Sequence, residues 1–175
     1  MLILQLLYFM LPAYFANMAP VFARQHLEWL NIPLDGGKKW RGKPILGSHK
    51  TLRGVVSGVV VGVVVAAVQY LLLPITGWLS LYSYEHWILL GLALSFGALL
   101  GDILKSFFKR QIGVKSGKAW VPFDQIDYAV GALAIGALVY FPGWLNALYI
   151  VLLSVTLHFI VNAIGFALGI RKQIL

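Results

Sequence analysis

The chain has 175 residues, of which 60% are hydrophobic and 11% are charged, and its mean hydropathy is +0.83. Soluble domains carry roughly 25% charged residues, so this composition excludes an ordinary soluble protein and indicates a single integral membrane domain over residues 1–175. The net charge of +8 does not indicate a nucleic-acid partner, because the basic residues form clusters between apolar segments, and the absence of cysteine excludes disulfides, thiolate catalysis and zinc–thiolate sites.

The first two apolar segments each predict a membrane-spanning helix. Residues 1–22 carry no charge and are about as long as a span of ~20 residues requires. A cleaved signal peptide is the alternative, but the segment lacks a positively charged start. Residues 54–73 form the clearest span, and glycine recurs there at every fourth position, which predicts a groove where another helix packs closely. These glycines are Gly54, Gly58 and Gly62.

Three further spans complete the prediction. Residues 87–101 are short for a span, so we expect their helix to continue into the charged residues 102–110. Residues 128–141 form a fourth, short span, and residues 144–170 form a fifth that is long enough to tilt. The predicted fold is an all-α integral membrane protein, a bundle of five transmembrane helices with two long cytosolic polar regions.

The basic residues predict the orientation of this bundle. Seven lie in residues 23–53, five in residues 102–122 and two, Arg171 and Lys172, near the C-terminus, which accounts for all fourteen. With five spans, all three groups fall on one side of the membrane. Basic residues are enriched on the cytoplasmic side, so the N-terminus is expected outside, and the C-terminus and the polar regions in the cytosol.

The second polar region places acidic and basic residues together at the ends of adjacent helices. At 100° per residue, one helix face presents carboxylate, hydroxyl and amine groups, and the other face is apolar. Asp124 and Asp127 are three residues apart at the start of the next helix and point one way. The first face carries Asp102, Lys105, Ser106 and Lys109, with Arg110 on its flank.

Paired carboxylates in such a place predict a Mg²⁺ site, because this ion prefers oxygen ligands and keeps positions for phosphate oxygens. Nearby lysine and arginine side chains would then bind the remaining phosphates. Each residue alone could instead be part of an exposed ion pair or, for Asp124, a helix cap. The whole constellation favours function, since a charged patch beside the membrane is costly unless it has one.

The first polar region contributes a second predicted phosphate contact. Lys50, Thr51, Arg53 and Gly54 lie where the helix of residues 54–73 begins, and a helix N-terminus favours anions. The alternative is that these charges only set the membrane orientation.

The motifs of both regions resemble one family of membrane enzymes. The pattern from Ser106 to Arg110, S-x-x-K-R, followed by D-x-x-D from Asp124 to Asp127, resembles the membrane cytidylyltransferases that make CDP-activated lipids. Asp35-Gly-Gly and the segment from Lys50 to Gly54 are similar to the upstream loop of the archaeal branch, the CDP-archaeol synthases. The bacterial-type enzymes carry a Pro-x-His-Gly-Gly loop between the two motifs, and this chain lacks it, which favours the archaeal branch.

The resemblance implies that the protein transfers a cytidylyl group from CTP to an unsaturated isoprenoid di-ether glycerol phosphate in the bilayer, with Mg²⁺ as cofactor, giving CDP-archaeol and pyrophosphate. It leaves the oligomeric state open. It implies catalytic roles for Asp102, Lys109, Arg110, Asp124 and Asp127, with the three aspartates holding metal. It implies contacts to CTP or lipid phosphate from Asp35, Gly36, Lys43, Lys50, Thr51, Arg53, Gly54 and Ser106.

Two other functions remain open from the sequence. The first is a related lipid-phosphate enzyme, such as a phosphatidate cytidylyltransferase or a polyprenol kinase. The second is a small transporter, which would need ionisable residues facing a pathway at the membrane midplane. The predicted spans are nearly free of charge, which argues against transport.

Overall fold

The computed structural model describes residues 1–23, 26–114, 118 and 120–167. Five long or medium helices dominate these residues, and the only sheet among them is a hairpin of two short strands. The basic residues Arg24, Lys115, Arg171 and Lys172, which the predicted orientation uses, lie outside the described residues. The elements are α1 (Leu2–Phe22), β1 (Lys39–Trp40), β2 (Lys43–Pro44), α2 (Leu52–Leu71), α3 (Leu73–Thr76), α4 (Trp87–Gln111), α5 (Phe123–Gly136) and α6 (Trp144–Ala167), with single 3₁₀ turns at Glu28–Leu30 and Gly77–Leu79.

Four helices in the described part of the chain, α1, α2, α4 and α6, are long and apolar enough to cross a membrane. The chain is therefore an all-helical membrane protein, and α4 continues into the charged residues as predicted. The expected span at residues 128–141 corresponds to α5, which begins earlier and has 14 residues. At 1.5 Å per residue this helix is about 21 Å long, shorter than the ~30 Å hydrocarbon core.

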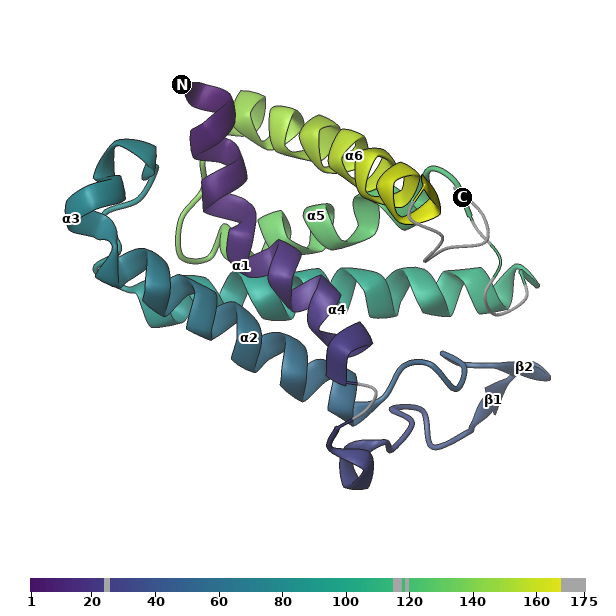
Figure 1. The fold of residues 1–175 in the computed structure, drawn as a ribbon. Helices are drawn as coiled ribbons and strands as arrows, with labels where there is room; N and C mark the ends of the chain where they lie inside the picture. Colours follow the sequence, from purple (N-terminus) through teal and green to yellow (C-terminus); the bar gives the residue numbers. More distant parts are fainter. Residues whose placement is uncertain (24–25, 115–117, 119, 168–175) are drawn as a thin grey trace.

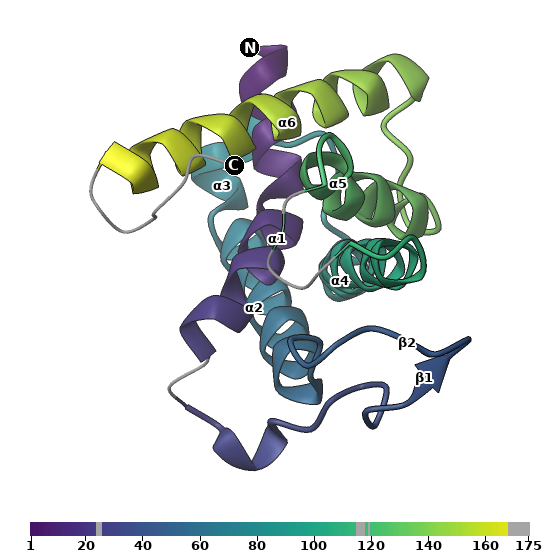
Figure 2. The same cartoon turned by 90° about the vertical axis from the view of Figure 1, so that its right-hand side faces the viewer.

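The helices pack as a bundle around α4 (Figure 1). Helix α5 runs along α4, α1 crosses α2 and α4, and α6 lies across α1 and α5. The view turned by 90° shows α4 and α5 nearly end-on and side by side (Figure 2). The buried side chains between the helices are mostly apolar or aromatic and include Leu6, Met10, Leu90, Leu94, Tyr128 and Ile150.

Glycines let α4 and α5 approach closely beside the charged residues. A Cβ atom added at Gly101 would overlap the carbonyl oxygen of Asp127, and one added at Gly131 would overlap the carbonyl oxygen of Gly97. Only hydrogen fits at these positions, as in closely packed membrane helices. The contact fixes the distance between the two helices that carry Asp102 and Asp127.

The predicted glycine groove on α2 is confirmed at two of its three positions. A Cβ atom at Gly58 would lie 2.8 Å from the carbonyl oxygen of Ala16, and one at Gly62 would lie 2.9 Å from that of Pro12. Helix α1 therefore lies directly in this groove. At Gly54 an added Cβ would make an ordinary contact of 3.4 Å with Pro20.

The first polar region folds back onto the last turns of α4. The ring of Trp40 stacks on Phe107 with 5.3 Å between centroids. The Lys43 ammonium donates to the carbonyl oxygen of Gln111, whose side-chain amide donates to the carbonyl of Pro44 at 3.3 Å. Figure 1 shows the hairpin beside that end of α4. These contacts join residues up to 68 positions apart and bring the two polar regions to one end of the molecule.

Candidate active site

Three aspartates from α4 and α5 surround the ammonium group of Lys105. The Lys105 Nζ lies 3.1 Å from Asp102 Oδ1, 2.9 Å from Asp124 Oδ1 and 2.9 Å from Asp127 Oδ2. Asp102 and Lys105 are one turn apart on α4, and the two other aspartates lie on the first turns of α5. The predicted convergence of carboxylates from two adjacent helices is therefore present in the structure.

Two further lysines bind the outer oxygens of this group. Lys50, which precedes α2, pairs with Asp102 Oδ2, and Lys109 pairs with Asp124 Oδ2 at 2.8 Å. The backbone amide of Trp120 donates to the same Asp124 oxygen at 2.5 Å. The three lysines and three aspartates, which we call the Asp–Lys cluster, balance formally to zero charge. Its members are Lys50, Asp102, Lys105, Lys109, Asp124 and Asp127.

Helix ends explain why this sequence assembles the cluster. The last turn of α4 carries Lys109 and Arg110, where the negative end of the helix dipole favours cations. The first turn of α5 carries Asp124, where the positive end favours anions. The cationic end of one helix thus meets the acidic start of the next.

Burial and the neighbouring lysines act in opposite directions on the two α5 carboxyls. Burial, together with the negative charge of Asp102, raises the pKa of Asp127 to about 6. The attraction to Lys105 acts in the opposite direction but does not outweigh them. The Asp127 side chain is only 6% exposed. At Asp124, burial is outweighed by hydrogen bonds from Lys109 and Lys105, and the pKa lies below its ordinary value. Both carboxyls contact the ammonium of Lys105 and so direct oxygens at one cationic point.

Ser106 and Arg110 border the cluster without joining its ion pairs. The Ser106 hydroxyl donates to the carbonyl oxygen of Asp102 at 2.8 Å, a bond within α4. The Nε of Arg110 is buried and has no hydrogen-bond partner in the part of the chain that the structure describes. A buried donor of this kind is costly to leave unsatisfied, so Arg110 suits an added anion.

Asp35 organises the loop that covers α4. Its carboxylate accepts the backbone amides of Gly37 at 2.9 Å, Leu46 at 2.8 Å and Gly47 at 3.1 Å. Slight burial would raise the pKa of Asp35, but these donors outweigh it and hold the pKa below its ordinary value. Gly36 has a φ of +57° in the same turn, a conformation that glycine adopts readily. The expected substrate residues Asp35 and Gly36 thus lie in a turn in which the carboxylate binds backbone amides.

We expect Asp35→Ala to loosen this loop, because three amides lose their acceptor, at a cost of about 1–3 kcal/mol. Hydrogen exchange of residues 36–47 should accelerate about tenfold or more, and Asp35→Asn should show a smaller effect because it keeps one oxygen acceptor. Since the folded pKa is depressed, this stabilisation is complete above the unfolded value of about 3.9 and is lost as the pH falls through the folded value. Unchanged exchange in Asp35→Ala would contradict this role.

The other expected substrate residues of the first loop lie around the start of α2. Thr51 is the N-cap, and its hydroxyl accepts the backbone amide of Gly54 at 3.3 Å. Arg53 places Nη1 3.5 Å from the carbonyl oxygen of His26. Lys43 lies instead on the end of α4, as described above. Of these loop residues, Lys50 enters the Asp–Lys cluster directly.

The chemistry of the cluster fits a divalent cation, although its present spacing is that of an ammonium site. Three carboxylate oxygens lie 2.9–3.1 Å from one point, whereas Mg²⁺–oxygen distances are about 2.1 Å. Among the described residues, no three His, Cys, Asp or Glu side chains are already spaced to hold a metal. Oxygen donors of the kind that divalent cations prefer are gathered here, and the ammonium of Lys105 lies between them.

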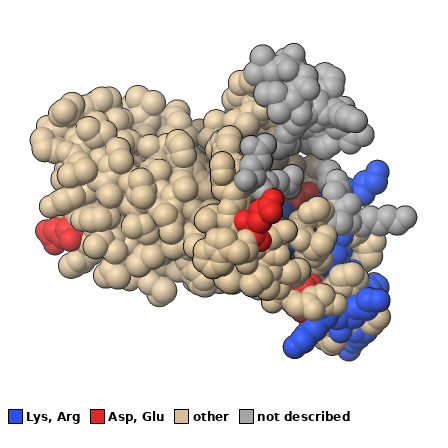
Figure 3. Space-filling view, turned by 60° about the horizontal axis from the view of Figure 1, so that its bottom comes forward, with Lys and Arg blue, Asp and Glu red and all other residues tan. Residues whose placement is uncertain are grey.

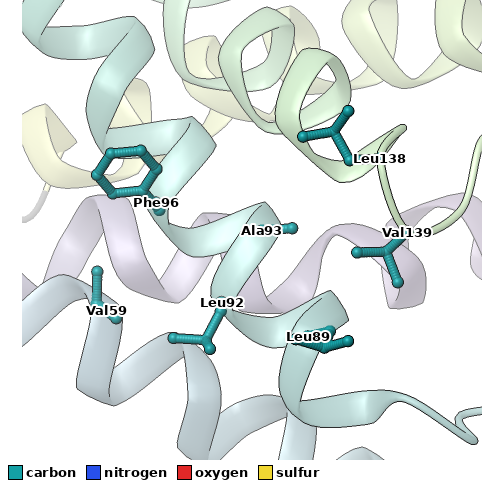
Figure 4. Close-up of a pocket in the computed structure, with 7 residues that line it drawn as sticks. All are labelled: Val59, Leu89, Leu92, Ala93, Phe96, Leu138 and Val139. Atoms are coloured by element: carbon teal, nitrogen blue, oxygen red, sulfur yellow. The ribbon is translucent and has the colours of Figure 1, made fainter.

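Of two hollows in the structure, the smaller adjoins the cluster and the larger is apolar. A cavity of about 40 Å³ lies beside the cluster and is lined on its polar side by His49, Lys50, Thr51 and Asp102. A larger hollow of about 370 Å³ between α2, α4 and the end of α5 is lined only by apolar side chains such as Leu92, Phe96 and Leu138 (Figure 4). The second hollow offers no polar side chain.

Lys105 is the residue that sequence reasoning did not assign. Its place on the polar face of α4 was predicted, but its position at the centre of three carboxylates depends on the docking of α5. The available signal was its spacing of three residues from Asp102, which puts the two side chains side by side on a helix. The Trp120 amide was also missed, since no sequence pattern indicates a backbone donor in that loop.

Comparison with known proteins identifies the family. The model of the CarS-like CDP-archaeol synthase family matches residues 1–174. The chain is 42% identical to the CDP-archaeol synthase of Methanospirillum hungatei over 93% of this chain and 98% of that protein. It is 38% identical to the CDP-archaeol synthase of Thermococcus gammatolerans over 93% of this chain and 91% of that protein.

The chain belongs to the CDP-archaeol synthase family. The resemblance inferred from the sequence is thereby confirmed. A solved structure described as an intramembrane enzyme for archaeal membrane lipids biosynthesis superposes with a TM-score of 0.76 at 28% identity, covering 90% of this chain and 92% of that one. The fold described above is thus shared with an intramembrane enzyme.

Proposed function

We propose that the Asp–Lys cluster is the site at which this CDP-archaeol synthase family member transfers a cytidylyl group from CTP to an unsaturated di-ether glycerol phosphate. The products are CDP-archaeol and pyrophosphate, made for membrane phospholipid synthesis. The observation that carries the proposal is the convergence of Asp102, Asp124 and Asp127 on one point, with lysines on their outer oxygens.

Asp102, Asp124 and Asp127 are the residues that would hold Mg²⁺. The bound ion would neutralise the charge that develops on the phosphates as CTP reacts. The buried carboxylates keep their oxygens directed at one point because α4 and α5 are locked together at Gly101 and Gly131. Lys109 and the Trp120 amide fix the orientation of Asp124.

The basic residues around the cluster would bind the phosphates of both substrates. Lys50 and Lys109 already lie within contact of the carboxylates, and Arg110 has a buried donor free of hydrogen-bond partners among the described residues. The amides at the start of α2, after Thr51, form a site that favours an anion. Lys43 and Arg53 add positive charge on the loop side, and Ser106, Asp35 and Gly36 support the elements on which these groups stand.

The reaction needs positioning and charge neutralisation more than proton transfer. A lipid phosphate oxygen attacks the α-phosphorus of CTP in line, and the bond from that phosphorus to the pyrophosphate oxygen breaks. The attacking phosphate is already ionised at neutral pH, so no general base is required. Preorganised cations at the cluster would stabilise the transition state without reorganising during the reaction.

The charge distribution supports a cytosolic site. Lys and Arg gather at one end of the visible face, Asp and Glu show beside them and in the middle of the face, and the opposite end shows no Lys or Arg (Figure 3). By the positive-inside rule the basic end faces the cytosol and the N-terminus lies outside. This orientation requires that α5 crosses the hydrocarbon core as a short fifth span, supported by its neighbours. CTP would then reach the cluster from water while the lipid chains stay in the bilayer.

The proposal is tested with purified protein, radiolabelled CTP and defined lipids in detergent or nanodiscs. The expected result is Mg²⁺-dependent incorporation of label into ether lipid with one pyrophosphate released per product. A preference for ester lipid phosphates would indicate a phosphatidate cytidylyltransferase, and release of nucleoside diphosphate would indicate a kinase. Substrate flux in proteoliposomes without a CTP-dependent lipid product would indicate a transporter.

A further inference from the structure

The cation at the centre of the Asp–Lys cluster belongs to the protein itself. Lys105 Nζ contacts one oxygen of each of the three aspartates, whereas Lys50 and Lys109 each contact one aspartate from outside. Lys105 therefore occupies the point that the three carboxylates share. No other basic side chain in the described residues is shown in contact with all three.

Electrostatics explains why this point needs a cation in the free protein. Like carboxylates at close range disfavour one another's ionisation, and at an effective dielectric constant near 20 unit charges 4 Å apart interact by about 4 kcal/mol. The ammonium of Lys105 neutralises part of this repulsion. A divalent ion at this point would be repelled by the ammonium of Lys105, since both cations would need the same oxygens.

The side chain of Lys105 is suited to leaving. Its ammonium is a compact point charge on a flexible stem of four carbons, and its side chain is 14% exposed rather than fully enclosed. The adjoining cavity of about 40 Å³ is far smaller than ligand sites of ≈300–1,000 Å³. A ligand that enters at this cavity has to separate the Lys50–Asp102 ion pair, and Asp102 is also one of the three partners of Lys105.

We propose that Lys105 is an exchangeable internal counter-ion, which holds the three aspartates together in the free protein and moves out when a divalent metal enters with the nucleotide. The displaced ammonium then faces the phosphates that the metal brings. This inference rests on the proposed function, because it takes the aspartates as the metal ligands. It assigns Lys105 a positioning role that differs from that of Lys50 or Lys109.

Titration of the purified protein with Mn²⁺, followed by electron paramagnetic resonance without nucleotide or lipid, tests the exchange. Lys105→Met removes the competing charge and keeps most of the length of the side chain. We expect its apparent Kd for Mn²⁺ to fall at least ~10-fold relative to the unchanged protein. Lys105→Arg, which keeps the charge, should not bind Mn²⁺ more tightly. Lys50→Met and Lys109→Met should gain less affinity than Lys105→Met.

Stability supplies a second readout. Without metal, Lys105→Met should unfold at a lower temperature, since three carboxylates lose their shared cation, and Mn²⁺ should raise that temperature more than it does in the unchanged protein. Equal or weaker Mn²⁺ binding by a folded Lys105→Met protein would overturn the counter-ion role. If the unchanged protein binds Mn²⁺ and Asp127→Asn binds it equally well, the proposed metal site itself fails, which is a distinguishable result.

Discussion

Asp127→Asn should lower cytidylyl transfer at least ~10²-fold, the scale of losing one electrostatic stabiliser. Asp127 is the most buried carboxylate of the cluster and contacts Lys105 at 2.9 Å. The amide keeps the size of the side chain but removes the charge that a metal needs. The loss should appear mainly in kcat/KM for Mg·CTP and should not be rescued fully by higher Mg²⁺.

The matched control is Lys39→Ala in the exposed hairpin. Lys39 has no part in the Asp–Lys cluster, so we expect a change of about twofold or less in the same assay. Near-normal Mg²⁺-dependent activity of Asp127→Asn would remove that residue from the metal role. A comparable loss in Lys39→Ala would show that the nucleotide binds nearer the hairpin than we propose.

Gly101→Ala should be the most damaging change outside the cluster. The added methyl group would overlap the carbonyl oxygen of Asp127 and approach Gly131 Cα at 3.2 Å, so α5 must move away from α4. Overpacking of this kind costs typically ~1–3 kcal/mol. A displacement of about 1 Å between the aspartates can cost ~10²-fold in rate. Thermal unfolding in detergent and the transfer assay measure the two effects separately.

Gly77→Ala provides the comparison for that variant. A Cβ atom at Gly77 meets no heavy atom within 4 Å, and the residue lies in the short 3₁₀ turn at the end of the molecule remote from the cluster. We expect its unfolding temperature and activity to remain close to those of the unchanged protein. Normal activity in Gly101→Ala would show that the α4–α5 contact does not position the carboxylates.

Much of the fold follows from the sequence because a bilayer restricts what a chain can do. Uncharged stretches predicted α1, α2 and α6, and the continuation of α4 into charged residues followed from the shortness of its apolar part. The boundaries of α5 were less predictable. Asp124 was expected at the start of this helix, and α5 begins one residue earlier, at Phe123, but the expected apolar span of residues 128–141 runs past the end of α5 at Gly136.

The positions of the three aspartates were predictable from the sequence, whereas those of the basic residues around them were less so. The spacing from Asp124 to Asp127 and the helix face of Asp102 depend on local periodicity, which the sequence contains. The ion pair between Lys50 and Asp102 joins residues 52 positions apart, and it depends on how the first loop docks through Trp40 and Lys43. No local pattern encodes such docking, so the loop residues could be grouped as phosphate contacts but not individually placed.

The most direct test of the account is electron–nuclear double resonance on protein loaded with Mn²⁺ and a non-hydrolysable CTP analogue. We predict ³¹P couplings that place the nucleotide phosphates on the bound ion. The signal should be lost or strongly reduced in Asp127→Asn and retained in Lys39→Ala. A Mn²⁺–phosphate signal of full strength in proteins that lack Asp102, Asp124 or Asp127 would contradict the assignment of the metal and the chemistry to the Asp–Lys cluster.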